Sequence, residues 1–250
     1  MKLAAKLHDV FSGMPTIAAG EAAGLRVFSR GADPNFAKGT YELPVQEAIV
    51  SNLMPGDVFY DIGANIGFFS LIAARRVGPV GQVYSYEPVP RNAAAITRSC
   101  EANGLVGVHV FAEAVGAETG RAELFLARHL GGATLAAVST PPDMNGRIEV
   151  EMTTLDDSIA MHGLRPPTLV KVDVEGAEVD VFRGMAKTLR VHRPRILCEV
   201  DDETKEGADR KTREIADVLT AAGYTLSPLP PSYADDAWQV LHLLAQPVRM

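Results

Sequence analysis

The chain has 250 residues, 47% hydrophobic and 22% charged, so it can bury a core and is not a disordered chain. Its formal net charge is −7, and no block of positive charge marks a surface for a polyanion, so we expect no nucleic-acid partner. Without an apolar run of bilayer-spanning length or a signal peptide, we expect one large α/β domain that is cytoplasmic and has no membrane partner. Cys100 and Cys198 lack metal-site spacing and are expected to be buried, reduced thiols.

The first part of the chain shows no residues that suggest chemistry. Residues 1–40 are predicted to form a helix and short irregular strands, an extension that packs on a domain comprising residues 41–250. An amphipathic helix is predicted over Val45–Leu53, ending before Pro55-Gly56. Glu42 precedes this helix, and two roles stay open for it. It is either an acid that favours the helix N-terminus or a side chain that faces a cofactor.

A short apolar strand then ends in an acid and a glycine-containing turn, Asp61-Ile62-Gly63-Ala64-Asn65-Ile66-Gly67, which leads into an amphipathic helix. Gly63 and Gly67 stand where side chains would clash, and Asn65 tolerates a left-handed backbone better than most residues. A strand, a tight turn and a helix N-terminus in this order are typical of a nucleotide-binding turn.

The residues of this turn discriminate between nucleotides. The dinucleotide fingerprint G-x-G-x-x-G is not present, and Asp61 at the head of the turn would repel a pyrophosphate. An acid there suits a ligand with an ammonium group, such as S-adenosylmethionine. We therefore expect this methyl donor to be the cofactor, in contact with Asp61, Gly63, Ala64, Asn65 and Gly67.

The next two strands extend this prediction. Gln82–Tyr86 is closed by Glu87-Pro88, and an acid at the tip of the second strand is placed to bind a ribose diol; the alternative is a surface acid. Pro88 and Val89 adjoin it and are included among the cofactor residues. The third strand, Val108–Ala112, is followed by Glu113 and Ala114, where an adenine would lie.

An insertion over residues 120–153 then breaks the alternation. Arg121–Ala127 and Arg147–Thr153 are predicted to be antiparallel strands joined by a polar loop, 128–146, that contains His129. Long connections are often functional, so the loop is either a lid that selects the substrate or a plain disordered segment.

The core resumes with the strand Leu169–Val174, which carries Lys171, Asp173 and, just beyond it, Glu175 on one face. Charges in a buried strand need partners, so these residues form a structural pair or belong to a ligand site at the strand end. Three more strands are predicted, at 195–200, 224–226 and 238–244, the last antiparallel at the sheet edge. The predicted architecture is a doubly wound, mostly parallel seven-stranded sheet.

Three stretches together, Asp61–Gly67, Glu87-Pro88 and Lys171–Glu178, resemble the FkbM family of S-adenosylmethionine-dependent methyltransferases. The likeness covers about Gly39 to Val200, and the last stretch is the most specific. It implies a class I, Rossmann-like methyltransferase fold and methylation of a hydroxyl on a small molecule such as a sugar or secondary metabolite. By resemblance, Asp61, Gly63, Asn65, Gly67 and Glu87 contact the cofactor. Asp173, with Glu175 and Glu178 behind it, lies at the reaction mouth.

The expected chemistry is in-line transfer of a methyl group to an acceptor oxygen, which needs alignment and removal of a proton. Asp173 is the first candidate base and His129 a second, with Lys171 and Glu175 as further catalytic candidates and Asp173 also near the cofactor. A divalent ion held by Asp173 and Glu199 is a further hypothesis. The alternatives are a nicotinamide-dependent oxidoreductase and a non-catalytic nucleoside-binding regulatory protein.

Overall fold

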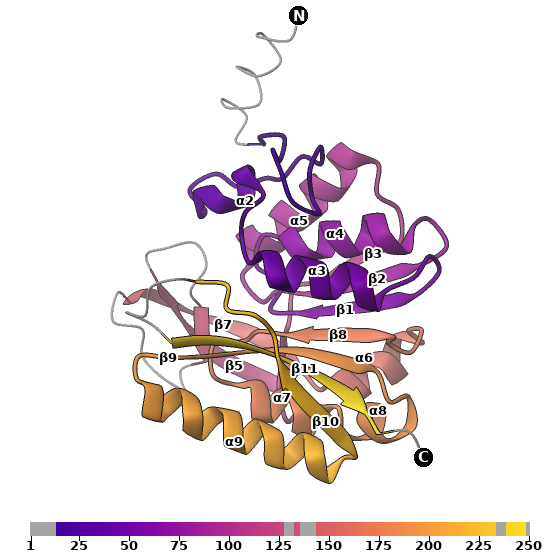
Figure 1. The fold of residues 1–250 in the computed structure, drawn as a ribbon. Helices are drawn as coiled ribbons and strands as arrows, with labels where there is room; N and C mark the ends of the chain where they lie inside the picture. Colours follow the sequence, from indigo (N-terminus) through magenta and orange to yellow (C-terminus); the bar gives the residue numbers. More distant parts are fainter. Residues whose placement is uncertain (1–13, 128–132, 136–143, 234–238, 249–250) are drawn as a thin grey trace, which may run out of the picture.

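The computed structural model describes residues 14–127, 133–135, 144–233 and 239–248, in which strands and helices alternate (Figure 1). Five parallel strands run side by side, and β11 pairs antiparallel with both β9 and β10. The order across the sheet is β3 (Val108–Phe111), β2 (Gln82–Tyr86), β1 (Val58–Ile62), β8 (Leu169–Val172), β9 (Arg195–Asp202), β11 (Gln239–Pro247) and β10 (Tyr224–Pro228). The predicted seven-stranded, mostly parallel sheet with an antiparallel last strand is confirmed.

The predicted position of the last strand was wrong. β11 lies between β9 and β10 rather than at the edge of the sheet. The burial of the two strands explains this order, because Leu243 and Ala245 of β11 are buried, whereas Thr225 and Ser227 of β10 are exposed. β10 ends in Pro228, which suits an edge strand that need not donate every ladder hydrogen bond.

Helices cover both faces of the main sheet (Figure 1). One face packs against α3 (Leu43–Asn52), α4 (Phe68–Val77) and α5 (Pro90–Asn103). The other packs against α6 (Leu155–His162), α7 (Glu178–Gly184), α8 (Ala186–Val191) and α9 (Lys205–Ala221). None of the helices among the described residues is both long enough and apolar enough to span a membrane. Both cysteines are buried and free, as predicted.

The described part of the N-terminal segment packs on the α3–α5 face. It contains the short helix α2 (Pro34–Lys38), which Asp33 caps by accepting the N–H of Asn35. The ring of Phe36 lies 4.2 Å from that of Tyr41 and 5.3 Å from that of Phe68, measured between centroids. This aromatic contact fixes the segment beside the start of α4. Residues 1–13 of the predicted N-terminal helix lie outside the described residues.

The insertion forms a small second sheet. β5 (Gly120–Ala127) and β7 (Met144–Thr153) pair antiparallel, which confirms the predicted hairpin. Two strands were not predicted: β6 (Ala133–Leu135) pairs with β5, and β4 (Ala114–Val115) pairs with β7. Because β4 follows β3 almost directly, its pairing holds the insertion against the carboxyl end of the main sheet. Most of the loop predicted between the hairpin strands, with His129, lies outside the described residues.

Candidate active site

The turn after β1 is shaped by two close backbone approaches. Gly63 has φ 78°, and a Cβ there would lie 1.8 Å from the carbonyl oxygen of Asp173 at the end of β8. Gly67 has φ 83°, and its Cβ would lie 2.9 Å from Ile96 of α5. Asn65 also has a left-handed backbone, with φ 53°. The glycines therefore let the turn touch a neighbouring strand end and helix.

Most N–H groups of the turn already have acceptors. Those of Gly63 and Ala64 both donate to the carbonyl oxygen of Tyr86 at 3.0 Å, and that of Gly67 donates to Ala64 at 2.8 Å. The N–H of Asn65 donates to Glu87 Oε2 at 2.8 Å. The turn is thus bonded to β2 and to itself. A pyrophosphate, which needs free N–H donors, would find these four occupied.

A cavity of about 470 Å³ lies at the carboxyl ends of the strands, within the range of small-molecule sites. Several segments that are distant in the sequence contribute to its wall. Of the residues predicted from the sequence, it is lined by Gly63, Asn65, Glu87, Pro88, Glu113, Ala114, Asp173, Glu175 and Glu199. The structure therefore brings the turn, the ends of β2 and β3, and the segment after β8 around one space.

Other predicted residues do not line this cavity. Ala64 and Gly67 are bound into the turn, Val89 supplies a backbone N–H to Glu87, and the side chains of Asp61, Lys171 and Glu42 lie behind the wall. These residues were expected to contact the cofactor or the substrate directly, but none of them lines the cavity. They support residues that do line the cavity.

Glu87 is a buried acid rather than a surface one, with 5% of its surface exposed. Its Oε1 accepts hydrogen bonds from the N–H of Val89 at 2.9 Å and from Asn92 at 3.4 Å, and its Oε2 accepts one from Asn65. Burial raises the pKa of Glu87 to about 7, although these donors oppose the shift. The carboxylate is held in one orientation at the cavity wall.

Asp61 lies beneath the turn and is fully buried. Ser70 of α4 donates to its Oδ2 at 2.5 Å, while Oδ1 accepts no hydrogen bond from the described residues. Asp61 stands opposite Lys171 in the β1–β8 ladder. Burial raises the pKa of Asp61, and the positive charge of Lys171 and the bond from Ser70 counter that rise. Asp61 is therefore a buried counter-charge for Lys171.

Lys171 joins this buried acid to the cavity wall. Its Nζ lies 2.8 Å from Asp173 Oδ2 and 5.0 Å from the ring centroid of Phe69. Burial alone would lower the pKa of Lys171, but the carboxylates of Asp173, Asp61 and Glu199 raise it above its usual value. Lys171 and Asp173 can therefore be both a structural pair and part of a ligand site, because Lys171 is buried while Asp173 lines the cavity.

Glu175 follows in a strained backbone conformation, with φ 55°. The loop is held by Glu178, whose Oε1 accepts the N–H of Gly176 at 2.9 Å and that of Val174 at 3.3 Å. Burial, together with the nearby acids Asp173 and Asp201, raises the pKa of Glu175 well above its ordinary value. Burial and these acids therefore favour the protonated form of Glu175, whose side chain lines the cavity.

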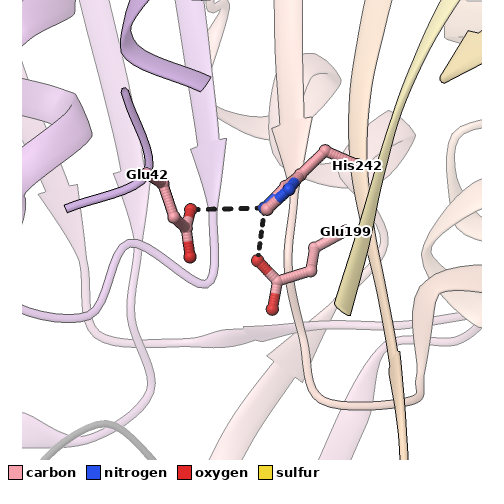
Figure 2. Close-up of side chains that lie close together, drawn as sticks. All are labelled: Glu42, Glu199 and His242. Carbon is pink, nitrogen blue, oxygen red and sulfur yellow. Dashed lines mark hydrogen bonds and ion pairs between the residues drawn. The ribbon is translucent and has the colours of Figure 1, made fainter. Parts of the chain in front are cut away.

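Glu42, Glu199 and His242 lie close together, and of the three only Glu199 lines the cavity (Figure 2). Glu42 has φ 44° and makes no side-chain capping bond to α3, and Tyr233 donates to its Oε1 at 2.7 Å. Its Oε2 lies 3.3 Å from His242 Nε2, and Glu199 Oε2 lies 2.9 Å from the same nitrogen. Burial would lower the pKa of His242, but the two carboxylates raise it to about 10. Glu199 thus groups with Glu42 and His242, whereas Asp173 pairs with Lys171.

Several lining residues were missed from the sequence. They are Gly31, Ala32, Asp33, Phe36, Tyr41, Tyr86, Asn92, Val115, Val174 and Leu124. The lining residues between Gly31 and Tyr41 showed no sequence pattern that indicates a site, apart from the helix start at Asp33-Pro34. Their position at the cavity depends on tertiary packing. Asn92 was more accessible to prediction, since a polar residue in the first turn after Glu87 can bond back to it.

The strand order, with a cavity at the carboxyl ends and an inserted antiparallel strand, defines a class I methyltransferase fold. A solved structure with this fold is the methyltransferase FkbM from Methylobacillus flagellatus KT, with a TM-score of 0.54 and 16% identity. The likeness covers 77% of this chain and 44% of that one, and at this identity it shows the fold alone.

Residues 61–226 match the methyltransferase FkbM domain, and the chain belongs to this family of S-adenosylmethionine-dependent methyltransferases. Among its relatives is 2-O-methyltransferase NoeI of Sinorhizobium fredii (strain NBRC 101917 / NGR234), 32% identical over 78% of this chain and 83% of that protein. Another is 31-O-demethyl-FK506 methyltransferase FkbM of Streptomyces tacrolimicus, 29% identical over 70% of this chain and 75% of that protein. The resemblance inferred from the three sequence motifs is confirmed.

Proposed function

We propose that this methyltransferase transfers the methyl group of S-adenosylmethionine to a hydroxyl oxygen of a small molecule. The observation that carries the proposal is Glu87, a buried acid at the tip of β2 whose carboxylate is fixed at the wall of the cavity. Oε2 accepts only the bond from Asn65 and keeps a free lone pair, whereas Oε1 accepts bonds from Val89 at 2.9 Å and from Asn92 at 3.4 Å, the longer of which a ligand hydroxyl can replace. A ribose diol has two hydroxyl donors that suit these two oxygens.

The remainder of the wall fits the same cofactor. Asn65 Oδ1 is buried and accepts no hydrogen bond from the described residues, which suits an ammonium group as donor. Glu113 and Ala114 border the cavity beyond Glu87, where the adenine is expected. The occupied N–H groups of the turn disfavour the pyrophosphate of a nicotinamide dinucleotide. These features support the methyl donor over the oxidoreductase alternative.

When bound, S-adenosylmethionine supplies a methyl group already activated by its sulfonium. The residues of this chain then have to orient an acceptor and take up one proton. In our proposal Asp173 accepts the proton of the acceptor hydroxyl, and the bond from Lys171 keeps its carboxylate in place. Burial and the nearby acids favour the protonated form of Glu175, so in this proposal it orients the acceptor rather than acting as the base.

The proposed acceptor class rests on the size of the cavity and on the relatives. The cavity of about 470 Å³ is bounded by Leu124 of the insertion and by Phe36 and Tyr41 near the N-terminal segment. NoeI is described as a 2-O-methyltransferase, and the Streptomyces tacrolimicus relative carries an O-methylation site in its name. We infer that the insertion and the N-terminal segment select the acceptor.

The proposal is tested by separating cofactor binding from turnover. Hydroxylated sugars and metabolites are screened for transfer of labelled methyl, and Asp173→Asn is compared with the wild type on any acceptor found. Loss of the base should lower kcat by about 10²- to 10⁴-fold. The affinity for S-adenosylhomocysteine should stay within about twofold, because Asn keeps the shape of the side chain.

Asp180→Asn is the matched control, since Asp180 lies on α7 and pairs with Arg183 at the surface. It should leave both measurements unchanged. Full turnover in Asp173→Asn would remove Asp173 as the base. Transfer of label only to nitrogen or carbon acceptors would contradict O-methylation.

A further inference from the structure

Glu42, Glu199 and His242 form a buried group, here named the Glu–His–Glu cluster, that the proposed methyl transfer leaves unused. Glu42 precedes α3, while Glu199 of β9 and His242 of β11 are direct partners in the antiparallel ladder. Their side chains are 1%, 15% and 2% exposed. Figure 2 shows both carboxylates directed at the same edge of the imidazole.

The hydrogen bonding of this cluster is incomplete. His242 Nε2 can donate a single hydrogen, and the bond goes to Glu199 Oε2 at 2.9 Å. Glu42 Oε2, 3.3 Å from the same nitrogen, accepts no hydrogen bond from the described residues. A buried carboxylate oxygen without a donor is costly. A single positive centre able to contact all three atoms would satisfy it.

The distances fit a metal ion at that centre. Zinc binds imidazole nitrogen and carboxylate oxygen at about 2.0 to 2.2 Å, which separates neighbouring ligand atoms by about 3 to 3.5 Å. The two distances from Nε2 to the carboxylate oxygens, 2.9 and 3.3 Å, are of this size. The three ligand atoms all lie within 4.8 Å of one another. One nitrogen and two oxygens suit Zn²⁺, Mn²⁺, Fe²⁺ or Co²⁺ better than Mg²⁺ or Ca²⁺.

The surroundings orient these atoms and leave His242 as the positive group in direct contact with the two carboxylates. Tyr233 holds Glu42 Oε1, and the Ser232 hydroxyl lies 3.4 Å from His242 Nδ1, so Oε2 and Nε2 remain directed at each other. Lys171 is bonded to Asp173, and in the described part of the chain no lysine or arginine forms an ion pair with Glu42 or Glu199. A divalent cation would balance the two carboxylates.

We propose that the Glu–His–Glu cluster binds one divalent first-row transition-metal ion through Glu42 Oε2, Glu199 Oε2 and His242 Nε2. Three protein ligands are typical of a site that keeps a coordination position open. Because Glu199 lines the cavity, the ion lies at its wall, where it can lower the pKa of an acceptor hydroxyl. That role rests on the proposed O-methylation, whereas binding of the ion does not.

Titration of the chelator-treated full chain with Co²⁺ tests the site directly, read by the visible absorption of the bound ion. We expect one Co²⁺ per chain, displaced by Zn²⁺. Glu42→Gln and His242→Gln should each weaken Co²⁺ binding at least about tenfold, because each removes a ligand. Glu47→Gln, on the exposed face of α3, is the matched control and should bind as the wild type does.

Two results would overturn the proposal: no saturable Co²⁺ binding by the wild type, or equal binding by the wild type and Glu42→Gln. Glutamine at position 42 can still accept the bond from Tyr233, so this variant decides the matter even if His242→Gln does not fold. Thermal unfolding verifies each variant. Since methyl transfer is not measured, failure here would leave the proposed function standing.

Discussion

Burial disfavours the ionised form of Glu87. A ligand that donates hydrogen bonds from hydroxyl groups would favour that form. The pKa of Glu87, about 7, means that the carboxyl is partly protonated near neutral pH. Hydrogen bonds donated by a ribose stabilise the carboxylate and lower its pKa in the complex. Cofactor binding should therefore release protons below about pH 7, and affinity should rise with pH up to that value and then level off.

Calorimetry of S-adenosylhomocysteine binding checks this prediction at about pH 6 and about pH 8, in buffers that differ in ionisation enthalpy. Proton release should be larger at the lower pH, and the affinity lower. Glu87→Gln, which cannot ionise, should bind more weakly and lose the pH dependence. An unchanged pH dependence in Glu87→Gln would assign the titration to another group.

Residue roles were predictable where they depend on position along one strand. Glu87 was found from the sequence because it directly follows β2, and Asp173 because it follows β8. The cluster with His242 was not found, since it depends on β11 pairing with β9 and on Glu42 arriving from α3. Similarly, Asp61 is fully buried and does not line the cavity, whereas Gly63 and Asn65 of the same turn do, which a linear motif does not reveal.

At the scale of elements, the turn between β1 and α4 closely contacts the end of β8, and both segments line the cavity. Gly63→Ala should reduce the free energy of unfolding by at least about 2 kcal/mol, because its Cβ would lie 1.8 Å from the backbone oxygen of Asp173. Gly104→Ala is the matched control, with φ 63°, ψ 27° and open space around its Cβ. It should cost only about 1 kcal/mol, the left-handed backbone term.

Urea denaturation of both variants measures the difference. Equal losses would show that the turn can move away from β8, and that the contact does not fix the geometry of the site. The wild type and Gly63→Ala should also differ in cofactor affinity, because any relief of the clash displaces Asp173 or the turn.

Most elements were predictable because their hydrophobic patterns and end signals are local. The turn after the first strand and the hairpin of the insertion appeared close to their predicted bounds. The helix α6 was not predicted, although Thr154 caps it by accepting the N–H of Asp157 at 3.0 Å, a signal present in the sequence. The short strands β4 and β6 exist only through pairing with β7 and β5, which a local pattern cannot indicate.

For the whole molecule, the alternation of strands and helices was enough to predict a doubly wound sheet, but not the insertion of β11 between β9 and β10. That placement brings His242 beside Glu199, and the N-terminal segment adds Phe36 to the wall. The cavity is therefore lined by residues between Gly31 and Glu199, with His242 of β11 bonded to Glu199. The half proposed to bind the cofactor follows from local motifs, whereas the half proposed to receive the acceptor depends on long-range packing.

The most direct test of the account is a crystal structure with S-adenosylhomocysteine. We predict that both ribose hydroxyls lie within hydrogen-bond distance of Glu87, that the amino-acid part lies at Asn65, and that the sulfur faces Asp173. Ligand density elsewhere, or a ribose that does not contact Glu87, would contradict the assignment of this cavity as the cofactor site.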